Sequence, residues 1–186
     1  MIHAAPGTDL WRKPPSEDIQ NAPCFIANFP VANFRRARAT ISANWTRQYD
    51  QGGLVLFLPG WPSHKLWVKT GIELYEGKPC VSAVAARSAA DWSLQPLPAG
   101  QTKVTLEIER EAVDVKKGTG SSLWVYLVEN GKRTAIREIT WVFKEKEDMA
   151  GLISIGIYAA RPTKKGQNDT EKLVVTFEDL TIQHPS

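Results

Sequence analysis

LWVKTGIELYEGKP, residues 66–79, alternates in the way that a β-strand does. Successive side chains of a strand point to opposite faces of its sheet. One face of this segment is suited to a hydrophobic core, because it carries Val68, Thr70, Ile72 and Leu74. The other face carries an aromatic ring, a cation, a bare backbone position and an anion, at Trp67, Lys69, Gly71 and Glu73, followed by Tyr75. This second face is the candidate binding surface of the molecule.

The next strand, 80–86, places further groups beside this face. A two-residue loop at Glu76-Gly77 would set Glu73 opposite Cys80, and Gly71 opposite Ser82. Gly71 adds no side chain, so we expect an open floor there that a ligand can reach. An aromatic platform with one donor and one acceptor around an open floor suits a sugar or polyol. A solvent-facing strand with mixed side chains, binding nothing, is the alternative interpretation.

Away from this hairpin, the chain contains short segments rich in β-branched and aromatic residues, separated by glycine and proline. Their spacing of roughly ten residues, without a long helical period, predicts an all-β sandwich or barrel. The Asn130-Gly131 pair predicts a second hairpin. The expected strands are 38–45, 53–58, 65–75, 80–86, 103–110, 112–116, 122–129, 133–143, 152–159 and 173–182.

A length of 186 residues, with 42% hydrophobic and 23% charged residues, is typical of one packed domain. Prolines at 6, 14, 15 and 23 disfavour a helix, so residues 1–23 are expected to form an extended arm that packs on the domain. The single domain itself is expected to cover residues 24–186.

Several classes of partner are disfavoured by the composition. The sequence has no stretch of eighteen apolar residues, so it predicts no membrane span. The basic cluster at Arg35, Arg36 and Arg38 is too short for a nucleic-acid footprint. The first residues do not have the pattern of a secretory signal, and two cysteines do not make a disulfide framework, so we expect a cytoplasmic protein. His3, His64 and His184 share no ligand spacing, and no glycine-rich phosphate loop is present; we therefore expect neither a metal nor a cofactor.

Five further segments resemble a known family when they are taken with 66–79. Residues 47–54, RQYDQGGL, are similar to a YDQ-G-L element of the regulation-of-enolase protein 1 family, and residues 67–73, WVKTGIE, match its WxKxGxE strand. ADWS at 90–93, IGIYAARP at 155–162 and VTFEDL at 175–180 follow in that family's order, while TDLW at 8–11 is similar to its opening. The resemblance extends from about residue 7 to 183. The chain departs from the family at 111–143, where a long hairpin replaces the usual turn.

This resemblance implies a concanavalin A-like jelly roll, in which two curved antiparallel sheets pack together and the polar strand face lies on the concave side. The predicted ligand is a small sugar, polyol or related metabolite, with a possible regulatory effect. A fold alone implies no reaction. The predicted ligand-binding residues are Tyr49, Asp50, Gln51, Trp67, Lys69, Glu73, Ser82, Arg87, Asp91 and Trp92.

Two alternatives remain open. The same groove could serve an enzyme, a hydrolase or an isomerase or cyclase of fungal small-molecule metabolism, with Lys69, Glu73 and Asp50 as acid and base. The chain could instead be a protein-interaction module that acts on a glycolytic partner such as enolase, as the family name suggests.

Overall fold

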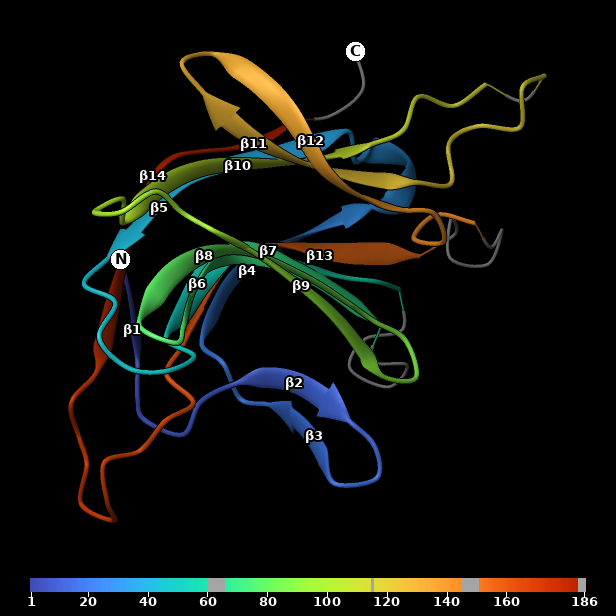
Figure 1. Ribbon diagram of the computed structural model, residues 1–186. Helices are drawn as coiled ribbons and strands as arrows, with labels where there is room; N and C mark the ends of the chain where they lie inside the picture. The colour runs from blue at the N-terminus through green and yellow to red at the C-terminus, as the bar shows by residue number, and fades with distance from the viewer. Residues whose placement is uncertain (60–65, 115, 145–150, 184–186) are drawn as a thin grey trace.

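The computed structural model describes residues 1–59, 66–114, 116–144 and 151–183, and these residues form two six-stranded antiparallel sheets that pack face to face (Figure 1). The first sheet has the order β1-β14-β5-β10-β11-β12, and the second has the order β4-β13-β6-β7-β8-β9. The expected all-β jelly-roll sandwich is therefore confirmed. The strands of the first sheet are β1 (Ile2–Ala4), β5 (Arg36–Ala43), β10 (Lys103–Arg110), β11 (Leu123–Glu129), β12 (Lys132–Ile139) and β14 (Leu173–Gln183). Those of the second are β4 (Cys24–Pro30), β6 (Gln51–Phe57), β7 (Trp67–Tyr75), β8 (Lys78–Ala86), β9 (Ala90–Pro96) and β13 (Leu152–Ala160).

The hydrophobic core lies between the two sheets, and strand alternation builds it. On β7, Val68, Ile72 and Leu74 point into this core, as the opening sequence stretch predicts. Ala39 and Leu106 contribute to it from the first sheet. The other face of β7, which carries Lys69 and Glu73, is consequently turned away from the first sheet.

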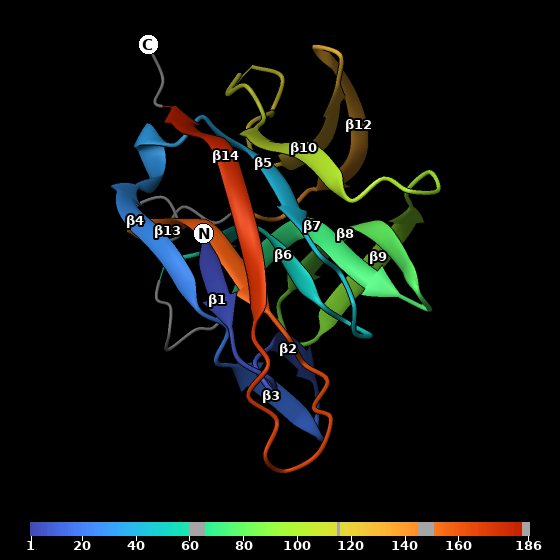
Figure 2. The same ribbon diagram turned by 90° about the vertical axis from the view of Figure 1, so that its left-hand side faces the viewer.

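A separate two-stranded hairpin covers that other face. It consists of β2 (Leu10–Lys13) and β3 (Glu17–Gln20), and the second sheet arches over it (Figures 1 and 2). Leu10 is buried in a small apolar cluster with Val55, Trp67 and Tyr158 of the second sheet. Apolar burial of this kind holds the hairpin to the sheet.

The first 23 residues therefore form more structure than the extended arm that the prolines suggest. β1 pairs with β14 at the edge of the first sheet, and β2 and β3 form their own hairpin. Pro14 and Pro15 lie in the turn between β2 and β3, where a missing backbone N–H interrupts no ladder. Prolines located in turns thus leave room for short strands on either side.

Two segments of the sandwich differ from expectation. The predicted strand 112–116 does not form in its described residues, and Val115 lies outside them. The side chain of Asp114 accepts hydrogen bonds from the backbone amides of Lys116 and Lys117, and an isolated bridge joins Asp114 to Thr119. Local side-chain hydrogen bonds compete here with the ladder. In contrast, residues 90–96, which are not among the expected strands, form the edge strand β9. The hairpins at Glu76-Gly77 and Asn130-Gly131 are confirmed.

Gly71 does not provide the open floor that we expected from the sequence. It lies opposite Gly53 of β6, and a Cβ added to Gly71 would approach the carbonyl oxygen of Gly52 to 2.0 Å. A Cβ added to Gly53 would meet the carbonyl oxygen of Thr70 at the same distance. The two glycines allow β6 and β7 to approach closely, so this gap is filled by backbone rather than left for a ligand.

Candidate functional site: a pocket between the second sheet and the hairpin

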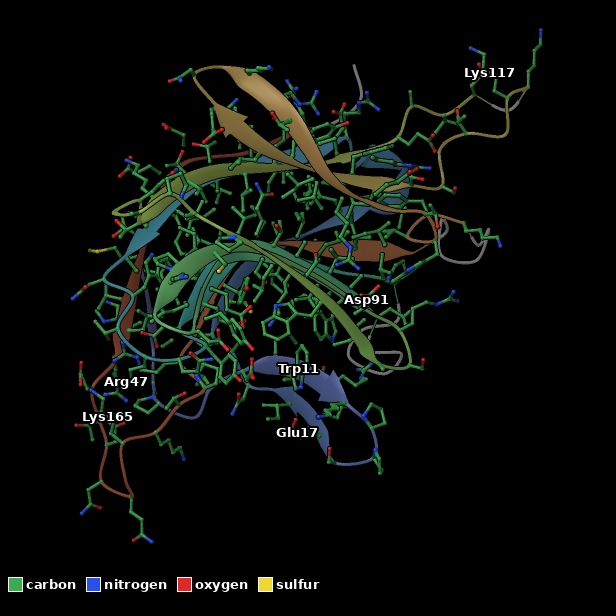
Figure 3. The ribbon with its side chains drawn as sticks, viewed as in Figure 1. Trp11, Glu17, Arg47, Asp91, Lys117 and Lys165 are labelled. Atoms are coloured by element: carbon green, nitrogen blue, oxygen red, sulfur yellow. The ribbon has the colours of Figure 1, made fainter. Side chains whose placement is uncertain are left out.

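A hollow of about 530 Å³ lies between the arched face of the second sheet and the β2–β3 hairpin. This volume is in the range of small-molecule sites. We call the hollow the concave pocket. Its lining combines carboxylates, aromatic rings and an amide, and Figure 3 shows Trp11 and Glu17 on the hairpin side. The lining residues are Gly7, Asp9, Trp11, Lys13, Glu17, Ile19, Tyr49, Gln51, Glu73, Trp92, Pro162 and Thr163.

A buried ammonium group lies beneath the floor of the pocket. Lys69 is 2% exposed, and its Nζ donates hydrogen bonds to the backbone oxygen of Leu10 at 2.7 Å and to Oε1 of Gln51 at 2.6 Å. The Oδ1 atom of Asp9 lies 3.9 Å from the same Nζ. The ammonium of Lys69 is therefore engaged by the protein itself. This differs from the prediction that Lys69 contacts a ligand. Lys69 fastens the hairpin to the sheet and orients the side chain of Gln51.

Glu73 is the charged residue of the predicted set that does reach the pocket. Its Oε2 accepts a hydrogen bond from Ser82 Oγ at 2.9 Å and another from Trp92 Nε1 at 3.1 Å. Ser82 is 2% exposed, so it acts as a support for Glu73 and not as a direct ligand contact. Glu73 lies on β7, and each of the next two strands, β8 and β9, donates one hydrogen bond to its carboxylate.

Two carboxyl oxygens in the pocket are left without a protein partner. Asp9 uses Oδ1 to accept the amide of Leu10 and Nε2 of Gln51, while Glu73 uses only Oε2. Within residues 1–59, 66–114, 116–144 and 151–183, no hydrogen bond reaches Asp9 Oδ2 or Glu73 Oε1. Neither oxygen is among the fully buried side-chain atoms that lack a partner, so both are accessible from the pocket, to a ligand or to solvent.

Aromatic rings form the wall of the pocket beside these carboxyl groups. The centroid of Trp92 lies 5.7 Å from that of Trp11 and 6.4 Å from that of Tyr49, in edge-to-face arrangements. Tyr49 has φ = 68°, in the left-handed region that non-glycine residues rarely adopt, and its ring is 38% exposed at the rim. Backbone strain of this kind costs on the order of 1–3 kcal/mol and is concentrated at functional sites.

Burial, and to a smaller extent the neighbouring charges, shift the pKa values of Glu73, Asp9 and Lys69. Burial raises the pKa of Glu73 above its ordinary value, although Lys69 opposes this shift. The pKa of Asp9 is raised for the same reason. Burial lowers the pKa of Lys69, and the two carboxylates partly offset that effect. Groups with such shifts in one cleft are typical of functional sites.

Two of the predicted contact residues are buried outside the pocket. Trp67 is fully buried in the apolar cluster beneath Leu10, so it cannot stack on a ligand. Asp50 is also fully buried, and it accepts two hydrogen bonds from Arg161, at 2.9 and 2.8 Å. Its Oδ2 further accepts the backbone amides of Thr46 and Arg47. Asp50 is thus a structural ion-pair partner rather than a ligand acceptor or a catalytic group.

Arg87 and Asp91 lie in a different place from the concave pocket. Together with Arg137 and Trp141 they line a second hollow of about 320 Å³. Asp91 is paired with Arg137 at 2.8 Å, and the guanidinium of Arg87 lies 5.1 Å from the centre of the Trp141 ring. Alternation along β9 explains the separation of Asp91 from the pocket, because Trp92 lines the concave pocket whereas its neighbour Asp91 lines the second hollow.

The structure brings together four predicted residues at the pocket, Tyr49, Gln51, Glu73 and Trp92, and adds Asp9 and Trp11 from the hairpin. Asp9 and Trp11 are not among the ligand-binding residues that the sequence predicts. The similarity of TDLW at 8–11 to the family's opening was the available signal.

Two absences concern the described part of the chain alone. Across its ranges, no three His, Cys, Asp or Glu side chains gather in a way that could hold a metal ion. In the same residues, no helix has the length and apolar character needed to cross a membrane. His64 and His184 lie outside the described residues.

The two sheets and the hairpin together define an antiparallel jelly-roll β-sandwich with a pocket on the concave face of its second sheet. Solved structures with this kind of fold include a functionally unknown protein from Saccharomyces cerevisiae, with a TM-score of 0.76 and 18% identity over 100% of this chain and 87% of that chain. An alginate lyase from Pseudomonas aeruginosa gives a TM-score of 0.55 with 16% identity, covering 92% of this chain and 77% of the lyase. A GH43 protein from Bacillus licheniformis gives 0.56 with 14% identity, covering 78% of this chain and 26% of that protein. At these identities the likeness shows the fold alone.

The chain belongs to the DUF1349 family, described as proteins of unknown function, whose model matches residues 1–185. An uncharacterised protein of Emericella nidulans, AN7484, is 46% identical over 182 residues, which is 98% of this chain and 84% of the relative. Neither description mentions enolase. The more specific resemblance to the regulation-of-enolase family stays a prediction.

Proposed function

We propose that the protein binds a small sugar, polyol or related metabolite in the concave pocket. The observation that carries this proposal is the pair of unpartnered carboxyl oxygens, Asp9 Oδ2 and Glu73 Oε1, beside the aromatic wall. Sugar hydroxyls donate hydrogen bonds to such oxygens, while the apolar faces of sugar rings pack on aromatic side chains. Fold relatives among carbohydrate-active proteins support the choice of ligand class.

The test is ligand binding by the full chain to a panel of monosaccharides, polyols and aminated or carboxylated sugars, measured by NMR and calorimetry. Trp92→Ala removes one aromatic wall and the donor to Glu73. We expect it to weaken binding by about tenfold or more, the equivalent of ~1.4 kcal/mol. Trp124→Ala is the matched control, because Trp124 stacks on Tyr126 in the first sheet, away from the pocket. Equal affinity of the wild type and Trp92→Ala for every ligand would contradict the proposal.

A second candidate, an enzyme that uses the same pocket, is favoured by the shifted pKa values. Asp9 and Glu73 have raised pKa values because of burial, and a raised pKa favours the protonated form that a general acid needs. In this candidate function Asp9 serves as an acid or base in place of the predicted Asp50, which is buried outside the pocket. Incubating each bound ligand with the wild type and with Glu73→Gln, followed by NMR, separates the two functions. Turnover by the wild type that disappears in Glu73→Gln at saturating ligand concentration identifies an enzyme; a ligand left unchanged by the wild type identifies a binding protein.

A further inference from the structure

The inner part of the concave pocket contains more negative than positive groups. Asp9 and Glu73 present two carboxyl groups, and Lys69 beneath them is the one ammonium that interacts with both. Lys69 directs its two hydrogen bonds to neutral oxygens, those of Leu10 and Gln51, and lies 3.9 Å from Asp9 Oδ1. One cation is therefore shared between two carboxylates, and an uncompensated charge of −1 is left when both are ionised.

Charges at the mouth of the pocket do not supply the missing cation. Lys13 and Glu17 lie directly opposite each other across the hairpin, so their charges offset one another. Arg12 points elsewhere: it pairs with Asp18 at 3.1 Å and donates to the backbone oxygen of Arg87. Among the charged residues that line the pocket, the carboxyl groups of Asp9, Glu17 and Glu73 therefore outnumber the ammonium of Lys13. The ammonium of Lys164 lies beside Gly7 but does not belong to this lining.

The aromatic wall has an electrostatic preference of the same sign. The faces of tryptophan and tyrosine rings are electron-rich and attract cations within about 6 Å of the ring centre. Trp11, Tyr49 and Trp92 line the same hollow as the two carboxyl groups. A ligand cation would be favoured by both features, whereas a carboxylated or phosphorylated ligand would be opposed by both.

We propose that the ligand of the concave pocket is a cationic amine, and specifically an amino sugar or amino polyol. This inference rests on the proposed function and narrows its ligand class. The ammonium donates to Glu73 Oε1 and Asp9 Oδ2, the two oxygens that lack a partner within the described residues, while the carbon skeleton packs on Trp11 and Trp92. Hydrogen bonds between charged groups are stronger than neutral ones, which is the source of the preference.

The experiment compares ligands that share one ring and differ in charge: glucose, glucosamine and glucuronate, and the corresponding galactose series. Each is titrated calorimetrically into the full chain at neutral pH and low salt. We expect the amino sugar to bind at least about tenfold more tightly than the neutral sugar, as one added charge-assisted hydrogen bond implies, and the uronate to bind most weakly. Glu73→Gln should remove most of this preference. Glu178→Gln makes the same chemical change on an exposed carboxylate of β14 and should leave the preference as in the wild type.

The outcomes separate this inference from the proposed function. Binding of neutral sugars without tighter binding of their amino forms overturns the inference and leaves the proposed function standing. A preference for the uronates also overturns it. Absence of binding by all six ligands counts against the amino-sugar inference, whereas the proposed function fails only if the wider panel of polyols and related metabolites also shows no binding.

Discussion

Two regions of the molecule bury a carboxylate beside a cation, and they differ in how many carboxyl oxygens are already used. Asp50 accepts four hydrogen bonds, two from Arg161 and two from backbone amides, which occupy both of its oxygens. In the concave pocket, Glu73 accepts hydrogen bonds through Oε2 alone, and Lys69 donates to neither carboxylate. The first arrangement uses both oxygens of its carboxylate, whereas the second leaves one carboxyl oxygen accessible to a ligand or to solvent.

The complete arrangement supports the incomplete one. By fixing the turn at residues 46–50, the Asp50–Arg161 pair positions Tyr49 at the rim and starts β6 at Gln51. Arg47 extends the support, because it pairs with Asp169 and Glu171 and lowers the pKa of both carboxyl groups. Buried ion pairs of this kind hold a conformation, and residues with unpaired polar oxygens carry out recognition.

The largest effect is expected from Asp50→Asn. The amide has nearly the same volume but no charge, so Arg161 remains buried beside an uncharged partner. Removal of one member of a buried ion pair costs about 3–5 kcal/mol of unfolding free energy. Denaturant unfolding measures the loss, and Asp91→Asn is the control, since this exposed ion pair should change stability by less than about 1 kcal/mol. Equal stability of the two variants would mean that the contrast between the regions is wrong.

A smaller effect is expected from Lys69→Met. The variant leaves the backbone oxygen of Leu10 and Oε1 of Gln51 without a donor, at a cost of about 1–3 kcal/mol. Part of this cost is recovered because a desolvated charge is removed. Since Leu10 belongs to β2, hydrogen exchange should accelerate in the β2–β3 hairpin and not in β10 or β11. Uniform acceleration across both sheets would contradict the fastening role of Lys69.

These contrasts also show what could be predicted from the sequence. Alternation of 66–79 correctly separated Val68, Ile72 and Leu74 from Lys69 and Glu73, because the period of a strand is local information. The register of the hairpin at Glu76-Gly77 was predictable for the same reason. Turn chemistry and strand period together were sufficient for the fold class.

The site was only partly predictable, because its composition depends on contacts distant in sequence. Nothing local shows that Arg161 pairs with Asp50, 111 residues away, or that Leu10 covers Trp67. The family-like segments included both structural and pocket residues, so resemblance did not distinguish Asp50 from Glu73. That distinction required the hydrogen-bond partners of each oxygen.

The smallest effect concerns the pH dependence of stability in Glu73→Gln. Burial raises the pKa of Glu73 above 4.5 in the folded state, so the folded protein binds this proton more readily than the unfolded chain. Its contribution to stability is therefore present below pH 4.5 and is lost as the pH rises through the raised pKa. The variant lacks this loss. Relative to the wild type, Glu73→Gln should become more stable as the pH increases from acid to neutral, by on the order of 1 kcal/mol.

Unfolding free energies of both proteins across that pH range provide the measurement. Glu178→Gln serves as the control, because it makes the same chemical change on an exposed carboxylate away from the pocket. If Glu73→Gln instead loses stability relative to the wild type as the pH rises, Glu73 is a carboxylate that the folded protein stabilises in its ionised form. The carboxyl group of Glu73 would then be part of the scaffold, and its free oxygen would no longer indicate a ligand.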